Sequence, residues 1–227
     1  MSFDDDLVSV IMSVYNAEDS LEESVNSILE QSYKNIEFLI IDDCSTDNSK
    51  KILKSFEKKY QNIKIFENNV NIGLTASLNK LLKVANGKYI ARQDADDISL
   101  HKRIETQLNI LKKYSLDFCS TRATIIQNNK TIPGLSFYLP KKLVIKFKNP
   151  FIHGTLFIKS QVIQNIGMYD EKYYYAQDYK LMQDLIRNNY KFKIIKKSLY
   201  FLNMENNISS INKKDQEYFA NQVRKNT

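Results

Sequence analysis

The feature that most constrains the fold is the regular alternation of strand-like and helix-like segments through the first half of the chain. Short apolar, β-branched runs predict buried parallel strands at residues 7–14, 36–43, 63–68 and 88–94. Apolar residues at helical spacing predict helices between them, at residues 18–32, 46–60 and 73–85. Strands separated by such helices indicate right-handed βαβ units. We therefore expect an α/β fold with a Rossmann-like, doubly wound, mostly parallel sheet.

The second half is less regular and predicts a smaller, mixed α/β lobe. A helix over residues 100–114 closes the regular part. Beyond it the patterns predict short strands in 117–138 with a turn near 127–130, a strand at 154–160, and helices at 175–190 and 212–225. No internal repeat or low-complexity linker interrupts the chain. We expect one domain over residues 1–227, with its two halves meeting near residue 115.

Composition narrows the class of protein. The 227 residues are 43% hydrophobic, enough for a globular core, and two cysteines suit a reducing compartment better than a disulfide framework. The first residues, MSFDDD, are acidic where a signal peptide is basic. No apolar run approaches the roughly 18 residues that cross a bilayer. These features predict a cytoplasmic protein, either soluble or held peripherally at the inner face of the cell membrane.

The net charge of +7 is unevenly distributed. Residues 1–115 hold 15 Lys and Arg against 18 Asp and Glu, a net charge of −3, and residues 116–227 hold 18 against 8, a net charge of +10. A basic half indicates either an anionic partner or an ordinary lysine-rich surface, and the count does not separate the two. No recognised RNA- or DNA-binding motif is present, so nucleic acid is not an expected partner.

Polar side chains follow three of the predicted strands where each strand ends. Ser13, Tyr15 and Asn16 follow the first strand. Asp43 follows the second, and a group of acidic residues follows the fourth. Because ligands of open α/β sheets bind beyond the carboxyl ends of the strands, we expect these residues to share one site.

The densest acidic group, in "YIARQDADDIS" (89–99), predicts a cation site. Asp94, Asp96 and Asp97 fall within four residues, where like charges repel. Mg²⁺ and Mn²⁺ prefer oxygen ligands, and such ions commonly take one or two protein carboxylates and complete their shell with substrate phosphates. The pattern therefore predicts a phosphate-bearing ligand.

Two alternatives apply to this segment. An EF-hand loop that begins at Asp94 places Glu105 at position 12, but it has Ile98 at position 5 and Ser99 in place of the required glycine. A helix-capping turn explains one aspartate, not three.

The other strand ends predict contacts to a nucleotide. A carboxylate at Asp43 can accept a hydrogen bond from a nucleobase N–H, and the aromatic and amide groups of "SVYNAED" (13–19) can stack on or bond to a base. Asn71 and Gly73 come to the start of a helix, where backbone N–H groups favour anions. Ordinary capping turns remain the alternative for the first two segments.

Together these segments resemble the family 2 inverting glycosyltransferases with the GT-A fold, of the type that builds bacterial surface glycans such as lipopolysaccharide and capsule. The resemblance covers residues 7 to about 190, and the ordered set is far more specific than the acidic triplet alone. The motifs that carry it are "VSVIMSVYNAE" (8–18), "SILEQSYKNIEFLIIDDCSTDNS" (27–49), "NIGLTASLN" (71–79), "YIARQDADD" (89–97), "NPFIHGTLFIKS" (149–160) and "YDEKYYYAQDYKLM" (169–182).

The resemblance implies a nucleotide-sugar donor, with a UDP-hexose as our expectation, and Mn²⁺ or Mg²⁺ as cofactor. Residues 1–115 become the donor-binding half and residues 116–227 the acceptor-binding half. Asp94 and Asp96 match the acidic diphosphate-binding motif, with Asp96 the firmer metal ligand. The family's nucleobase contacts match Ser13 and Asp43, with Tyr15 and Asn16 in the same loop. Arg92 is expected near the donor phosphates or sugar.

The catalytic base of the family, a carboxylate at a helix start, matches Asp178 in "AQDYKLM", with Asp170 and Asp184 as rival carboxylates and a helix cap as the alternative role. The family usually has glycine at Cys44, glutamate at Gln177 and tryptophan at Met182. These last two differences leave the acceptor, a glycan or a lipid-linked sugar, undefined.

Two further features stay open. His153 and Gln177 are expected at the acceptor, although a packed histidine is the alternative for His153. "KKLVIKFK" (141–148) joins a basic face to an apolar one and suits either an anionic membrane contact or an ordinary exposed segment. Two competing functions also fit parts of the pattern. A nucleotidyltransferase would need a glycine-rich loop after the first strand, which "SVYNAED" lacks, and an inactive nucleotide-sugar-binding module would not need Asp178.

Overall fold

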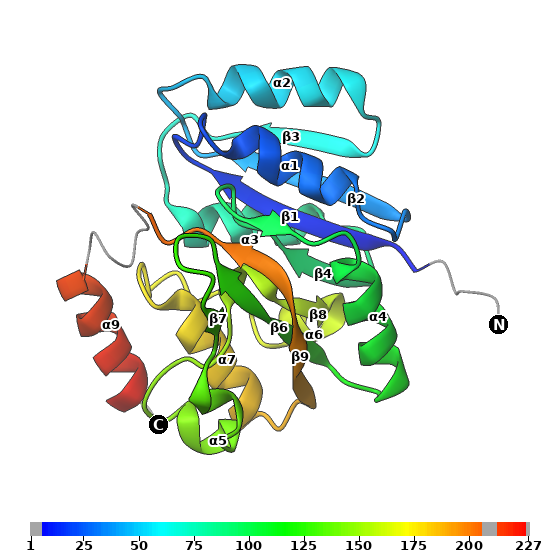
Figure 1. Cartoon of the computed structure of the whole chain (residues 1–227). Helices are drawn as coiled ribbons and strands as arrows, with labels where there is room; N and C mark the ends of the chain where they lie inside the picture. Colours follow the sequence, from blue (N-terminus) through cyan, green and yellow to red (C-terminus); the bar gives the residue numbers. More distant parts are fainter. Residues whose placement is uncertain (1–5, 206–212, 226–227) are drawn as a thin grey trace.

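The structure is a computed structural model that describes residues 6–205 and 213–225. Its centre is one nine-stranded sheet in the order β3-β2-β1-β4-β8-β6-β9-β5, with β7 paired to β6 (Figure 1). The strands are β1 (Val8–Val14), β2 (Ile36–Asp42), β3 (Ile63–Glu67), β4 (Tyr89–Arg92), β5 (Ile98–Ser99), β6 (Phe118–Ile125), β7 (Thr131–Ile132), β8 (Phe157–Lys159) and β9 (Phe192–Leu202). The helices are α1 (Leu21–Leu29), α2 (Ser49–Lys59), α3 (Leu74–Val84), α4 (Arg103–Lys113), η1 (Leu135–Phe137), α5 (Lys141–Val144), η2 (His153–Thr155), α6 (Ser160–Asn165), α7 (Gln177–Arg187) and α9 (Lys213–Lys225).

The four strands β3, β2, β1 and β4 run parallel, as the alternation predicts. β1 pairs with β2 on one side and with β4 on the other, so the strand order reverses direction there. Such a switch point opens a crevice beyond the carboxyl ends of the two strands. The loops that follow β1 and β4 carry Tyr15 and the acidic group, so both border that crevice.

Helices cover both faces of this parallel half because side chains alternate across a strand. Val10 and Met12 of β1 pack with the apolar faces of α1, α2 and α4 in one cluster. Ile11 packs in a second cluster with α3 and α7. Every residue of β2 is buried, as expected for a central parallel strand. The doubly wound arrangement is therefore confirmed.

The second half of the chain extends the same sheet. β8 pairs antiparallel with β4 and with β6, and β9 pairs parallel with β6 along seven residue pairs. β9 is an eleven-residue strand that the sequence patterns do not predict. The short elements β5, α5 and α6 were not predicted either. The predicted strands and helices begin and end within three residues of their predicted bounds, and residue 212 of the last predicted helix lies outside the described residues.

Within residues 6–205 and 213–225, no helix combines the length and the apolar character needed to cross a bilayer.

Candidate active site

The loops after β1 and β2 are joined by hydrogen bonds at Asn16. Its Oδ1 accepts from the backbone N–H of Thr46 at 2.8 Å, and its own N–H donates to Ser45 Oγ at 3.1 Å. Asn16 has φ 48°, a left-handed conformation that asparagine tolerates. Its neighbour Tyr15 is 51% exposed, so its ring is available for stacking, and Ser13 lies half-buried at the end of β1.

Cys44, in the loop after β2, also has a left-handed φ, at 64°. The resemblance noted above expects glycine at this position, and a positive φ is the reason that glycine is preferred there. The chain adopts the turn with a side chain that is strained in it. The turn is therefore retained at this position, at a cost in backbone energy.

Asp43 is buried, and both its carboxylate oxygens bind the loop that leads into α3. Oδ1 accepts from Asn68 Nδ2 at 2.8 Å and from the N–H of Ile72 at 2.9 Å, and Oδ2 accepts from the N–H of Gly73 at 2.8 Å. A carboxylate of the chain itself thus occupies these two N–H groups. The N–H groups of Ile72 and Gly73 are therefore already bonded within the chain, and Asn71 is exposed.

The loop at Gly73 also contacts the second half of the chain. Gly73 has φ +84°, and a Cβ there would lie 2.8 Å from the ring of Tyr174. Thr75 Oγ1 donates to the carbonyl of Tyr173 at 3.5 Å. The start of α3 and the segment before α7 therefore form one wall across the crevice.

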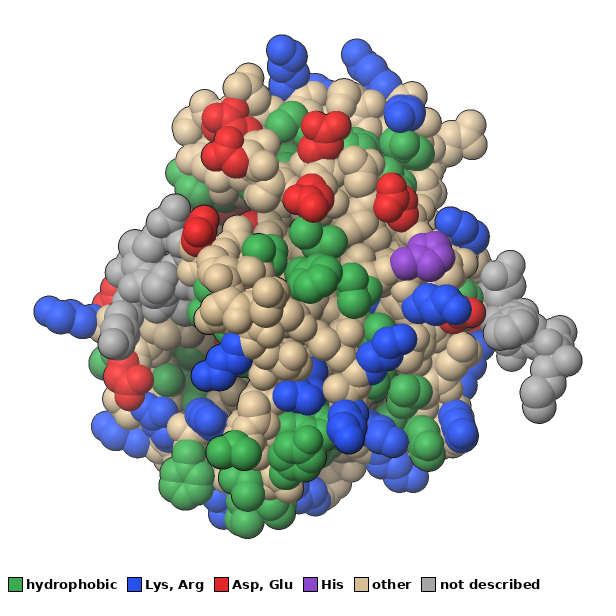
Figure 2. Space-filling view, viewed as in Figure 1, with side chains coloured by type: hydrophobic (Ala, Val, Ile, Leu, Met, Phe, Trp, Pro, Cys, Tyr) green, Lys and Arg blue, Asp and Glu red, His purple; other side chains and the backbone are tan. Residues whose placement is uncertain are grey.

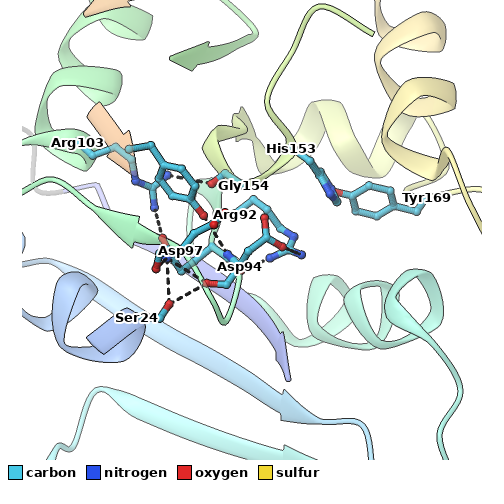
Figure 3. A network of polar contacts seen from close by, with 10 residues as sticks. Ser24, Arg92, Asp94, Asp97, Arg103, His153, Gly154 and Tyr169 are labelled. Atoms are coloured by element: carbon cyan, nitrogen blue, oxygen red, sulfur yellow. Dashed lines mark hydrogen bonds and ion pairs between the residues drawn. The ribbon is translucent and has the colours of Figure 1, made fainter. Parts of the chain in front are cut away.

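The acidic group after β4 is organised by a buried arginine (Figure 3). Arg92 is 1% exposed and its Nη2 lies 2.5 Å from Asp94 Oδ1. Its Nη1 donates to the carbonyl of Gln93. Burial opposes its charge, but Asp94 and other neighbouring anions outweigh that effect and raise the pKa of the guanidinium. Arg92 thus offsets the charge of Asp94 and engages its Oδ1.

Asp97 is the most buried of the three aspartates, at 1% exposure. Its Oδ1 accepts from the N–H of Asn203 at 2.7 Å, just after β9. Burial, followed by the charges of Asp94 and Asp96, raises the pKa of Asp97 to about 9. Asp97 is therefore protonated at pH 7, which removes one negative charge from the group.

Asp96 is the carboxylate that remains for a ligand. It is partly exposed, and no hydrogen bond or ion pair from another described residue reaches its carboxylate. Burial, together with the charge of Asp94, raises the pKa of Asp96 to about 6. A carboxylate with raised proton affinity and no partner suits a hard cation. In the described part of the chain no group of three or more His, Cys, Asp or Glu is arranged to hold a metal ion.

The EF-hand alternative is wrong. Glu105 lies on α4 and accepts from Ser32 Oγ at 2.8 Å, away from the aspartates. The segment after Asp94 forms the two-residue strand β5 rather than a calcium loop between helices.

A second buried arginine, Arg103, was not among the predicted site residues. It is fully buried, its Nη2 donates to Gln93 Oε1 at 3.3 Å, and its guanidinium lies 5.4 Å from the ring centre of Tyr200. Burial lowers the pKa of Arg103 to about 10, which leaves it charged at pH 7. The burial of Arg103 could have been predicted from the sequence, because Arg103 lies beside Ile104 and Leu108 on the apolar face of the predicted helix.

Gly154 brings the second half against the acidic group. A Cβ at this residue would lie 2.6 Å from Asp94 Oδ2 and closer still to the hydroxyl of Tyr200. That hydroxyl accepts from the N–H of Asp94 at 3.1 Å. Only glycine allows η2 to approach this closely.

His153, next to it, pairs with Tyr169. His153 Nε2 lies 2.8 Å from the Tyr169 hydroxyl (Figure 3). Burial, and then the charge of Arg92, lowers the pKa of His153, so the ring is neutral at pH 7. Burial raises the pKa of Tyr169. The charges of Asp178 and Asp94 raise the pKa values of both His153 and Tyr169, against the effect of Arg92.

Asp178 lies in the first turn of α7, after Ala176, which has a left-handed φ of 57°. Strained residues of this kind concentrate at functional sites. Asn149 Nδ2 donates to Asp178 Oδ2 at 2.7 Å and fixes one oxygen. Gln177 beside it is buried.

The rival carboxylates are engaged elsewhere. Asp184 pairs with Lys180 one turn along α7, and Asp170 accepts from the N–H of Lys172 in a local turn. Each contact is local to its own segment. Among the three carboxylates, Asp178 is the one that stands at a helix start beside the His153–Tyr169 pair.

Residues 9–198 match the sequence profile described as Glycosyl transferase family 2. The chain belongs to this family. The match covers most of the chain and runs through both halves of the sheet, so family membership is not confined to the nucleotide-binding pattern.

Several relatives share extended identity with the chain. EpsE, a glycosyltransferase of Bacillus subtilis (strain 168), is 38% identical over 165 residues, which are 71% of this chain and 59% of EpsE. MJ1057 of Methanocaldococcus jannaschii, a glycosyltransferase, is 35% identical over 92% of this chain and 76% of its own length. WfgD of Escherichia coli, a UDP-Glc:alpha-D-GlcNAc-diphosphoundecaprenol beta-1,3-glucosyltransferase, is 32% identical over 82% of this chain and 72% of WfgD. The chain thus spans well under two thirds of EpsE.

Solved structures share the fold. Staphylococcus aureus TarS 1–349 in complex with UDP-GlcNAc superposes with a TM-score of 0.80 at 20% identity, over 96% of this chain and 65% of that one. The mannosyltransferase PcManGT of Pyrobaculum calidifontis, in complex with GDP-Man and Mn²⁺, gives 0.79 at 17% identity, over 96% and 63%. The predicted GT-A α/β fold is confirmed.

Proposed function

We propose that this glycosyltransferase is an inverting, metal-dependent enzyme that transfers a hexose from a UDP-sugar to a hydroxyl of a glycan or lipid-linked acceptor. One observation carries the proposal: Gly154 packs against Asp94 of the donor half, and Asn149, five residues before it, donates to Asp178 of the acceptor half. One segment, residues 149–154, therefore contacts both the donor carboxylate motif and the candidate base. TarS with UDP-GlcNAc and WfgD with UDP-Glc make a UDP-sugar the donor to test first.

Donor binding is assigned to the loops beyond β1, β2 and β4. Tyr15 offers a ring for the base, Ser13 a hydroxyl, and Asp43 the remaining acceptor capacity of its carboxylate. Asn16 acts through the loop that it holds, because its amide oxygen is already used by Thr46. Arg92 is assigned to the diphosphate side of the site, where its guanidinium is paired with Asp94.

Asp96 is the residue that would hold Mn²⁺ or Mg²⁺, with Asp94 adjacent to it. When bound, such an ion supplies positive charge to the departing diphosphate. Asp97 supports the loop by accepting a hydrogen bond from the N–H of Asn203. PcManGT was solved with Mn²⁺, which makes manganese the ion to test first.

Asp178 is assigned as the general base. It would take the proton of the acceptor hydroxyl as that oxygen attacks the anomeric carbon from the face opposite the leaving group. A single displacement of this kind inverts the anomeric centre. Asn149 holds Oδ2 of Asp178 in place, which leaves Oδ1 for the proton. His153 and Gln177 are assigned to the acceptor side, next to the base.

The test is a screen of nucleotide sugars for Mn²⁺-dependent release of nucleoside diphosphate, followed by transfer to candidate acceptors and analysis of the product anomer. Asp178→Asn keeps the size and the Asn149 contact, so donor binding should survive while transfer falls by about 10²–10⁴-fold. Full turnover by that variant would remove Asp178 from this role. Donor binding with no turnover on any acceptor would instead support a binding module.

A further inference from the structure

An exposed surface at the end of the molecule farthest from α2 combines large apolar side chains with lysines. Five apolar side chains within thirteen residues are more than half exposed, at 55–88% of their surface. We call these residues and the lysines beside them the basic-apolar surface; it consists of Leu135, Tyr138, Leu139, Leu143 and Phe147, with Lys142, Lys146 and Lys148. Apolar side chains exposed at this density mark an interaction site rather than an ordinary surface.

The chain segment that carries this surface has charges of one sign. Residues 118–169 contain no Asp or Glu and seven Lys or Arg. Figure 2 shows the same division on the face in view: Asp and Glu gather over the upper part near α1 and α2, and hydrophobic side chains lie among Lys and Arg at the lower end near α5. An apolar centre with a cationic border is complementary to an anionic lipid surface, into which the apolar groups insert while the cations meet the headgroups.

The surface is preformed. Lys141 does not belong to the cationic border, because its Nζ is turned inward and donates to the carbonyls of Ser136 at 3.2 Å, Leu139 at 2.7 Å and Phe137. This one side chain closes the loop from η1 to α5. Docking therefore requires little ordering of the loop, and less conformational entropy is lost.

The surface is also connected to the proposed base. Tyr179 Oη donates to the carbonyl of Ile145 at 2.6 Å, which joins α5 to α7. Arg224 Nη1 donates to the carbonyl of Phe147 at 3.0 Å, which joins it to α9. Asn149, two residues after Phe147, donates to Asp178. A membrane bound here lies next to the segment that positions the base.

We propose that the basic-apolar surface docks the protein on an anionic membrane and so presents a lipid-linked acceptor to Asp178. The second part rests on the proposed function, whereas docking itself does not. Vesicle binding is measured without donor or acceptor, so a failure of docking and a failure of glycosyl transfer are distinguishable.

The charge test compares vesicles of phosphatidylglycerol mixed with phosphatidylcholine against phosphatidylcholine alone. Wild-type protein should co-sediment with the anionic vesicles and less as salt is raised. Lys146→Glu/Lys148→Glu should weaken the partition by about 25-fold or more, since each lysine near the surface contributes about fivefold. Lys51→Glu/Lys58→Glu makes the same charge change on α2 and should alter binding by less than about twofold, because α2 lies beyond a Debye length from the bound membrane. Equal loss in both variants would overturn the proposal.

The insertion test uses the absence of tryptophan from the chain. Tyr138→Trp places a single fluorophore in the surface, and Val70→Trp places one at an exposed site of the donor half. Emission from the Tyr138→Trp variant should shift to shorter wavelength with anionic vesicles, and emission from the Val70→Trp variant should not. All substituted side chains are exposed, and a thermal melt checks that each variant folds. No shift, or a concentration-dependent dimer that Leu135→Ser/Phe147→Ser abolishes, would assign the surface to something other than a membrane.

Discussion

At the scale of single residues, the three neighbouring aspartates have three different states. Asp94 is paired with Arg92, Asp97 keeps its proton, and Asp96 is left for a ligand. Three carboxyl groups so close together are tolerated because burial and the neighbouring arginine give them different pKa values, so they do not all carry a negative charge at once. Other carboxyl groups that share a site behave in the same way. The cation that relieves the repulsion most directly is a buried arginine of the chain itself.

This division makes adjacent aspartates unequal in donor binding. Asp96→Asn should weaken binding of a UDP-sugar in the presence of Mn²⁺ by about 100-fold or more, because the ion loses its main carboxylate. Asp97→Asn makes the same chemical change one residue away and should leave binding within about threefold, because Asp97 is neutral at pH 7 and Asn keeps the acceptor for Asn203. Calorimetric titration with and without Mn²⁺ measures both. A reversed order of the two variants would contradict the assignment.

Cys44 carries backbone strain that can be measured. Its φ of 64° is a conformation that costs a residue with a Cβ about 1–2 kcal/mol, and glycine avoids that cost. Cys44→Gly should therefore be more stable than Cys44→Ala by about 1 kcal/mol, after allowing for the greater chain entropy of glycine. Urea unfolding of the two variants gives the difference, and equal midpoints would show that the turn relaxes.

At the scale of elements, the site depends on the start of α7 being held against the segment before η2. Asn149 makes this connection through its side-chain amide. The segment also carries Phe151, whose N–H donates to Asn149 Oδ1 at 3.0 Å, so both ends of the amide are used. The orientation of the proposed base is thus set by a residue outside its own helix.

Asn149→Asp turns this contact into a repulsion. A carboxylate beside Asp178 raises the pKa of that base, because a second negative charge disfavours ionisation. The acid limb of the pH–rate profile should move to higher pH by about one unit, with activity partly recovered in alkaline buffer. Asn149→Ala should lower kcat without moving the limb. If the acid limb of the pH–rate profile lay at the same pH in the wild type, Asn149→Asp and Asn149→Ala, Asn149 would not act on the base.

At the scale of the whole molecule, buried carboxylates make stability depend on pH. The pKa of Asp97 is about 9 and that of Asp96 about 6 in the folded protein, both above the ordinary 3.8. Between about pH 4 and pH 9 the folded state therefore holds more protons than the unfolded state, and the free energy of unfolding falls as the pH rises. The slope is at most about 1.4 kcal/mol per pH unit for each group.

Unfolding of the protein in chelator should show this decline between pH 5 and pH 9. Asp97→Asn has no proton to lose there and should flatten the upper part of the curve, above about pH 6. Chemical denaturation across the range measures both. If the free energy of unfolding of the wild type instead rose between pH 5 and pH 9, Asp96 and Asp97 would be ionised in the folded protein and their charges balanced by neighbouring groups.

The sequence by itself determined the donor half, because its information is local. Each predicted strand and helix up to α4 has its own apolar period, and Tyr15, Asp43 and Asp96 each come within four residues of the end of a strand. Position along the chain therefore predicts that Tyr15, Asp43 and Asp96 reach the same edge of the sheet.

Only the tertiary structure decided how those residues are used. Arg103, Asn149 and Tyr169 act across long distances in sequence, and no local pattern records such pairs. β9 was not predicted from the sequence because its buried residues do not alternate strictly with exposed ones. Its burial is set by its pairing with β6 and β5. The protonation of each aspartate likewise follows from burial and neighbouring charges, which exist only once the two halves of the sheet have come together.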